Sequence, residues 1–145
     1  MLRKVLDLLK APEQDAQPAL TTELATAALL SEIIRADRHA DERELNAYRA
    51  MLDARFSLTD EQIDALMEDG RETAEEAVDM VQFTQVLNER CDNEEKRAIL
   101  KSLWEVAYAD KEIAPIEEHT IRRIADLLHM PHSQFIKTKL DVTST

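Results

Sequence analysis

The sequence matches itself when it is shifted by 73 positions. Glu32 then aligns with Glu105 and Glu44 with Glu117, and apolar residues between 27 and 51 align with apolar residues between 100 and 124. Each copy is predicted to form an apolar helix that ends in Ala, Asp and a basic residue, followed by a short loop and an amphipathic helix. Because one helix pair cannot bury its own apolar face, the repeat predicts a domain in which two pseudo-symmetric helix–loop–helix units pack together.

The scarcity of glycine indicates that the whole fold is helical. The 145 residues include one Gly and four Pro, too few for the tight turns of a sheet of hairpins. Gly70 is expected to end a helix, and Leu30, Ile33, Leu103 and Val106 are expected in the core. Periodicity and capping patterns predict an all-α bundle of about seven to eight helices, over residues 1–10, 24–34, 42–56, 60–69, 73–88 and 93–108, with the last two beginning near 115 and 131.

The N-terminal segment is expected to stand apart from this bundle. Residues 1–10 carry an apolar stripe at helical spacing, and prolines at 12 and 18 bracket a polar linker. We therefore divide the chain into a short amphipathic helix with its linker, 1–18, and a helical domain, 19–145. We expect the short helix to pack on the bundle; a weak membrane or partner contact is the alternative. The stripe consists of Leu2, Val5, Leu6 and Leu9.

Charge is concentrated in the middle of the chain. The net charge is −12, and residues 57–95 alone hold thirteen acids against two bases. Such a chain is repelled by phosphate backbones, so nucleic acid is not an expected partner. An acidic middle third attracts a basic protein or cations, unless it is only a solvated face. No apolar run approaches the ~20 residues of a membrane span, and no signal peptide is recognisable, which favours the cytoplasm.

One acidic pair in each repeat is the candidate site. Asp37 and Asp110 end the first helix of their repeats, and Glu44 and Glu117 follow seven residues later, at the third helical position. An Asp at a helix C-terminus is unfavourable with the helix dipole, so a compensating contact is expected. The carboxylates either accept hydrogen bonds from their own loop backbone as structural clamps, or bind Ca²⁺ or Mg²⁺. The spacing does not fit the EF-hand calcium loop.

No set of residues indicates catalysis. Glycine scarcity excludes phosphate-binding and dinucleotide-binding loops, and no nucleophile–base–acid arrangement is visible. Cys91 is the only cysteine, which excludes an internal disulfide; its position just before a helix start would lower its pKa. We therefore expect no enzyme and no obligatory cofactor, but a module that binds an unidentified protein and can form a homo-oligomer.

The repeated motif resembles a known family. Ala36-Asp37 followed by Glu44, Ala109-Asp110 followed by Glu117, and the stretch from Leu103 to Asp110 are similar to TerB-like domains, named for bacterial tellurite resistance, in an uncharacterised bacterial branch. The resemblance covers about residues 22–140. It implies an all-helical fold, no established enzymatic activity, and links to stress response and metal ions. Members usually have Gly after each Asp, whereas this chain has Arg38 and Lys111.

Overall fold

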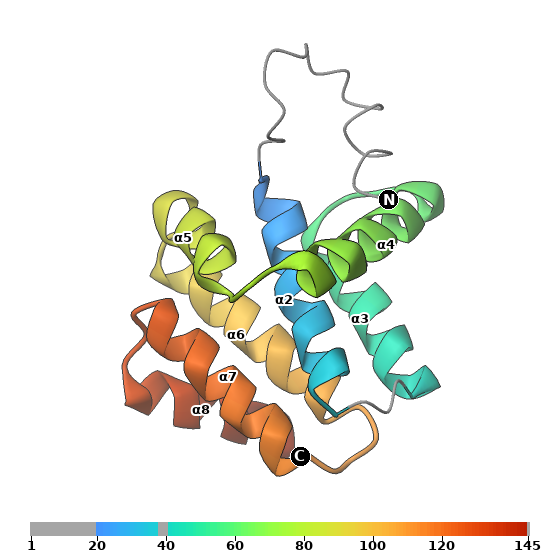
Figure 1. Cartoon of the computed structure of the whole chain (residues 1–145). Helices are drawn as coiled ribbons and strands as arrows, with labels where there is room; N and C mark the ends of the chain where they lie inside the picture. The colour runs from blue at the N-terminus through green and yellow to red at the C-terminus, as the bar shows by residue number, and fades with distance from the viewer. Residues whose placement is uncertain (1–19, 38–40, 145) are drawn as a thin grey trace.

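The computed structural model describes residues 20–37 and 41–144, and within these ranges all regular structure is helical (Figure 1). The all-α fold is therefore confirmed. The helix expected over residues 1–10 lies outside the described ranges. The seven described helices are α2 (Thr22–Asp37), α3 (Glu42–Arg55), α4 (Asp60–Glu76), α5 (Val81–Arg90), α6 (Asn93–Ala107), α7 (Pro115–Leu127) and α8 (His132–Thr143).

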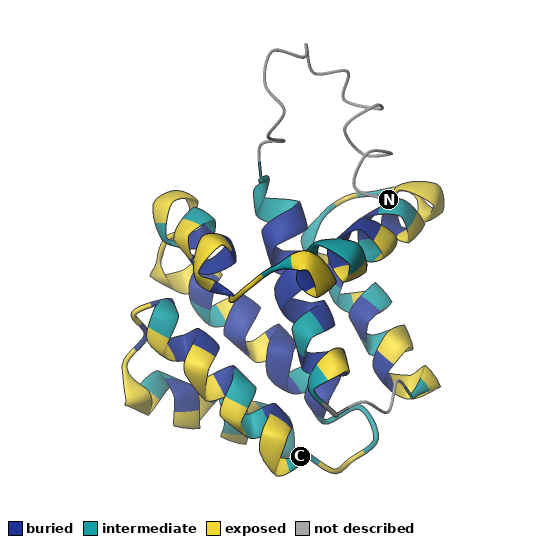
Figure 2. Ribbon diagram, in the orientation of Figure 1, coloured by how far each residue is buried: buried dark blue, intermediate teal, exposed yellow. Residues whose placement is uncertain are grey.

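Helix α2 runs through the centre of the molecule. It packs against α3, α4, α5, α6 and α7, and α6 packs in turn against α3, α7 and α8. Figure 2 shows buried residues along both α2 and α6. The four residues expected in the core are at most 1% exposed. An uninterrupted apolar run thus folds as a helix surrounded by other helices.

Local signals in the sequence fix most helix starts. Thr59 accepts a hydrogen bond from the Gln62 backbone, while the Gln62 side chain accepts one from the Thr59 backbone, and Asp92 and Glu95 form the same capping box. Asp41 caps α3 through the backbone N–H of Arg43, at 2.6 Å. These bonds satisfy N–H groups that have no partner inside the helix, which explains why the predicted starts agree with the structure.

The prediction that Gly70 ends a helix is wrong. Helix α4 continues through Gly70 to Glu76, and the helix expected over 73–88 is divided between α4 and α5. A Cβ at position 70 would lie 2.8 Å from the Ala27 Cβ and 2.8 Å from the Tyr48 Oη. Glycine is therefore needed here for the close approach of α4 to α2, rather than for a turn.

The break between α4 and α5 has its own local cause. Residues 77–80 leave the helix, and the Asp79 side chain accepts a hydrogen bond from the Val81 backbone N–H at 2.9 Å. A short acidic side chain that binds a nearby N–H stabilises a new helix start. The periodicity of 73–88 does not reveal this break, because the apolar positions continue across it.

Candidate functional site

The predicted glutamates occupy equivalent places in helices α3 and α7. Each is the third helical residue, and each is only 1% exposed. Glu117 Oε1 accepts a hydrogen bond from the Ala114 backbone N–H at 2.9 Å, and Glu44 accepts one from the Asp41 backbone. Both side chains therefore close the first turn of their own helix, as the sequence predicted.

The structure also brings these two glutamates, 73 positions apart, into contact with each other. Burial, a hydrogen bond to Glu117 and repulsion from the Glu117 and Asp110 carboxylates together raise the pKa of Glu44 to about 8, and burial contributes most. Two carboxylates in contact cannot both ionise without strong repulsion. The pair therefore shares a proton near neutral pH and titrates as a unit.

Asp110 acts as a clamp on its own loop. Its Oδ1 accepts a hydrogen bond from the Glu112 backbone N–H at 3.0 Å, within the loop between α6 and α7. The expected contact with loop backbone is thus present. This bond holds the chain in the turn that delivers Glu117 to the start of α7.

The residue after Asp110 adopts a conformation that favours glycine. Lys111 has φ of 71°, in the left-handed region. Its backbone N–H donates to the Tyr108 carbonyl at 2.9 Å, and its Nζ lies 5.3 Å from the centre of the Tyr108 ring. The loop therefore places a lysine in a backbone conformation that favours glycine, at a conformational cost.

The first repeat can be followed only in part. Asp37 is the last residue of α2, but its side chain lies outside the described residues, as does Arg38. The clamp expected at Asp37 thus stays a prediction. Within the described ranges, no three His, Cys, Asp or Glu residues lie close enough to hold a metal ion together.

Cys91 is not an activated thiol. Burial raises its pKa, and the nearby Glu95 carboxylate adds to the effect. The lowering of the pKa expected from its place before a helix start does not occur, because burial, together with the Glu95 carboxylate, outweighs the adjacent helix N-terminus.

A groove between α2, α3 and α4 is a feature that the sequence reasoning missed. It encloses about 710 Å³. Its apolar lining comes from Ile34 on α2, from Leu45 and Tyr48 on α3, and from Met67 on α4. Leu45 is 40% exposed, whereas Ile34 and Tyr48 are 7% and 2% exposed. The arrangement depends on three helices meeting, so periodicity within any one of them does not predict it.

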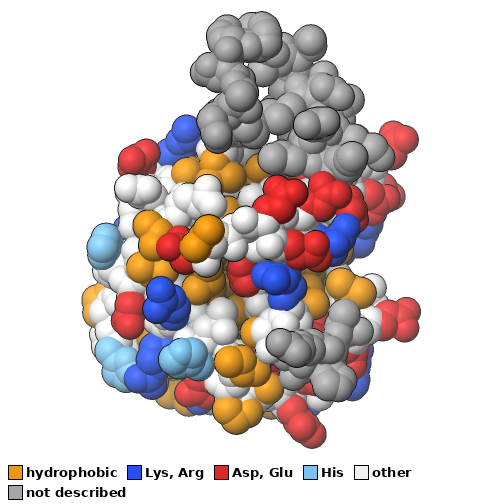
Figure 3. Space-filling view, in the orientation of Figure 1, with side chains coloured by type: hydrophobic (Ala, Val, Ile, Leu, Met, Phe, Trp, Pro, Cys, Tyr) orange, Lys and Arg blue, Asp and Glu red, His pale blue; other side chains and the backbone are white. Residues whose placement is uncertain are grey.

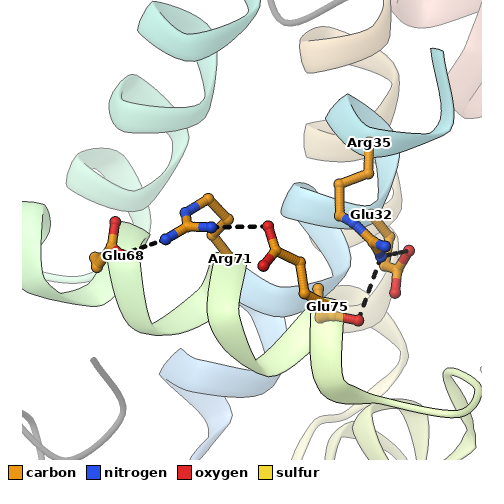
Figure 4. A network of polar contacts seen from close by, with 6 residues as sticks. Glu32, Arg35, Glu68, Arg71 and Glu75 are labelled. Atoms are coloured by element: carbon orange, nitrogen blue, oxygen red, sulfur yellow. Dashed lines mark hydrogen bonds and ion pairs between the residues drawn. The ribbon is translucent and has the colours of Figure 1, made fainter. Parts of the chain in front are cut away.

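Ion pairs line the groove. Arg71 bridges Glu68 and Glu75 on α4, and Arg35 on α2 donates to the Ala74 carbonyl at 3.3 Å (Figure 4). A further pair joins Arg49 of α3 to Asp64 of α4. These side chains are between 36% and 68% exposed, so they hold the rim in place while remaining open to a ligand.

Helix α4 makes this side of the molecule acidic. Its 17 residues contain eight acids and one base, a net charge of −7, and Figure 3 shows acidic side chains gathered along it. The acidic middle third noted in the sequence therefore forms one wall of an apolar groove. The groove lining itself carries three arginines and three acids, so the acidic surplus of α4 lies around the groove and attracts a basic ligand to this side of the molecule.

Comparisons with known proteins agree with the fold. Among the described residues, no helix is both long enough and apolar enough to span a membrane. No curated protein matches the chain, and no solved structure matches it. A family model, described as tellurite resistance protein TerB, matches residues 23–140, which is most of the sequence. The chain belongs to the TerB family.

Proposed function

We propose that this TerB domain is a non-catalytic interaction module, and that it binds a basic amphipathic helix of a partner protein in the groove between α2, α3 and α4. The observation that carries the proposal is a groove with an apolar lining, in which Leu45 is 40% exposed, on the side of the molecule where α4 has a net charge of −7. Helices commonly bind such grooves through apolar side chains at i, i+3, i+4 and i+7. The overall charge of −12 argues against nucleic acid as the partner.

The composition of the chain supports a cellular location for this interaction. A single cysteine supports a cytoplasmic location, because secreted domains of this kind more often carry pairs of cysteines in disulfides. A role in stress or tellurite resistance would then operate through the bound partner, without a reaction at this domain.

Binding of a synthetic helix tests the proposal directly. The probe is a labelled peptide with leucines on one face and lysines on the other, and its control has glutamates in place of the lysines. Fluorescence anisotropy should show binding of the lysine peptide only, and added salt should weaken it because salt screens the attraction. Leu45→Glu should abolish binding, whereas Leu140→Glu, at a leucine 51% exposed on α8, should not. Equal binding by both variants would refute the groove as the site.

Divalent-cation binding at the glutamate pair is a second candidate. The contact between Glu44 and Glu117 favours it, because a cation would take the place of the shared proton. Two carboxylates are fewer ligands than Ca²⁺ or Mg²⁺ uses, and no third described acid lies close enough to join them, so Asp37 or water molecules would have to complete the site.

Proton release distinguishes this candidate from a purely structural pair. Adding Mg²⁺ or Ca²⁺ to wild type should raise the melting temperature and release protons near neutral pH, and neither effect should occur in Glu44→Gln. A wild-type melting temperature that is the same in chelator and in either metal would eliminate the cation candidate.

A further inference from the structure

We infer that two copies of this chain associate with two-fold symmetry through a hollow between the C-terminal end of α2, the connection 77–80 and α7. The hollow encloses about 580 Å³. Arg35 borders both this hollow and the groove between α2, α3 and α4, and the two share no other lining residue. The inference therefore concerns a different surface and does not rest on the proposed function.

Exposed apolar side chains gather at the hollow. Val78 in the connection is 98% exposed and Ile116 on α7 is 47% exposed, and both line the hollow. Val81, which is 42% exposed, directly follows Met80, another lining residue. Such a group differs from the single apolar residues that are scattered over any protein surface, and its burial against a second apolar surface is favourable.

The backbone that carries Val78 is anchored on both sides. The Ala77 N–H donates to the Ala74 carbonyl at 3.3 Å, Asp79 binds the N–H at the start of α5, and Met80 packs into the core. In Figure 1 the connection between α4 and α5 crosses the face turned toward the viewer, above α7. One face thus holds both an apolar projection and a hollow, so two identical faces can interlock, each Val78 entering the hollow of the other copy.

The charges around the hollow favour a second copy over a partner of one sign. Two copies that each carry a net charge of −12 repel each other, so they can meet only where the facing groups balance. The lining of the hollow has two acids and two bases, a net charge of zero, namely Glu32, Asp79, Arg35 and Arg123. A strongly basic or acidic segment gains nothing from such a lining, whereas a copy of the same face presents both signs.

One charge of each sign is available to a partner. Glu32 and Arg35 already pair with each other at 3.2 Å. Among the residues that the structure describes, Asp79 and Arg123 form no ion pair, although both line the hollow. In a two-fold contact, if a residue of one copy faces a second residue of the other, the reverse contact forms as well. Arg123 of each copy can then face Asp79 of the other, which gives two equivalent ion pairs.

Sedimentation equilibrium of the full chain tests the inference. From about 10 μM to about 1 mM, the average mass of wild type should rise toward twice that of the chain. Val78→Glu should weaken association on the order of tenfold or more, because it places an acid in the hollow of each partner. Leu140→Glu is the matched control, since it adds the same charge at an apolar residue of α8 that is 51% exposed, and it should leave association unchanged.

Charge exchange tests the symmetry of the contact. Arg123→Glu and Asp79→Lys should each abolish association, because each places like charges opposite one another. An equimolar mixture of these two variants should associate, and the double variant should associate with itself, because both arrangements restore opposite charges. Asp79→Lys loses a helix cap, so circular dichroism verifies its fold, and Val78→Glu tests the contact without altering the cap.

Three results would overturn the inference. The first is a wild type that remains a monomer at about 1 mM. The second is association that Val78→Glu leaves as strong as in wild type, since the copies would then meet through another face. The third is failure of the folded Arg123→Glu and Asp79→Lys variants to associate on mixing.

Discussion

Replacing Glu44 by Gln should stabilise the protein at neutral pH, although it changes a buried residue of the core. The pKa of Glu44 is about 8 in the folded state, against an ordinary value of 4.5. At about 1.4 kcal/mol per unit, holding its proton to pH 7 costs up to roughly 3 kcal/mol. Glutamine needs no bound proton to donate to Glu117, and it can still cap α3.

The sign of the pH dependence follows from the raised pKa. Below the ordinary value of 4.5, the folded and unfolded states are both protonated, and the contribution to stability is fully present. As the pH rises toward 8, the unfolded chain releases the proton while the folded chain retains it, so the free energy of unfolding falls. Denaturant unfolding of wild type from about pH 5 to about pH 9 should show this decline, and Glu44→Gln should show a flatter profile.

Two further variants complete the test. Glu117→Gln should flatten the profile as well, because either member of the pair can hold the proton. Glu112→Gln, at an exposed residue of the loop between α6 and α7, should leave the profile as in wild type. A Glu44→Gln protein that is less stable than wild type at neutral pH, or that keeps the full decline, would refute the shared proton.

Substitutions at three other positions test the loops and the close helix contact by thermal melts. Lys111→Gly should raise stability by about 0.5–1 kcal/mol because it relieves the left-handed conformation. Lys111→Ala keeps this strain and loses the contact with Tyr108, so it should not raise stability. Gly70→Ala should lower stability by about 1–3 kcal/mol, since its Cβ would collide with Ala27. Helix propensity alone would instead predict a gain in stability, and such a gain would contradict the close approach of α4 to α2 at this position. Asp110→Ala should lower stability by about 1–2 kcal/mol in chelator through loss of the bond to the Glu112 backbone, and unchanged melting would argue against the clamp.

Much of the fold could be predicted from local chemistry. Capping residues such as Thr59 and Asp92 act on N–H groups two or three positions away, so their effect is readable from the sequence. Gly70 misled the prediction because its role depends on Ala27, a residue on another helix. The break at Asp79 was missed because the helical period of apolar residues continues across it.

The candidate site divides in the same way. The 73-residue repeat and the capping position of Glu44 and Glu117 were predicted from the sequence, because each glutamate serves its own helix. Only the tertiary structure decided that the two carboxyls touch and that burial raises the pKa of Glu44, since both effects arise when α3 and α7 pack against the same two helices, α2 and α6. The tertiary structure likewise decided that Leu45 and acids of α4 border one groove. A sequence determines the apolar and charged faces of each helix, but the fold determines which faces meet.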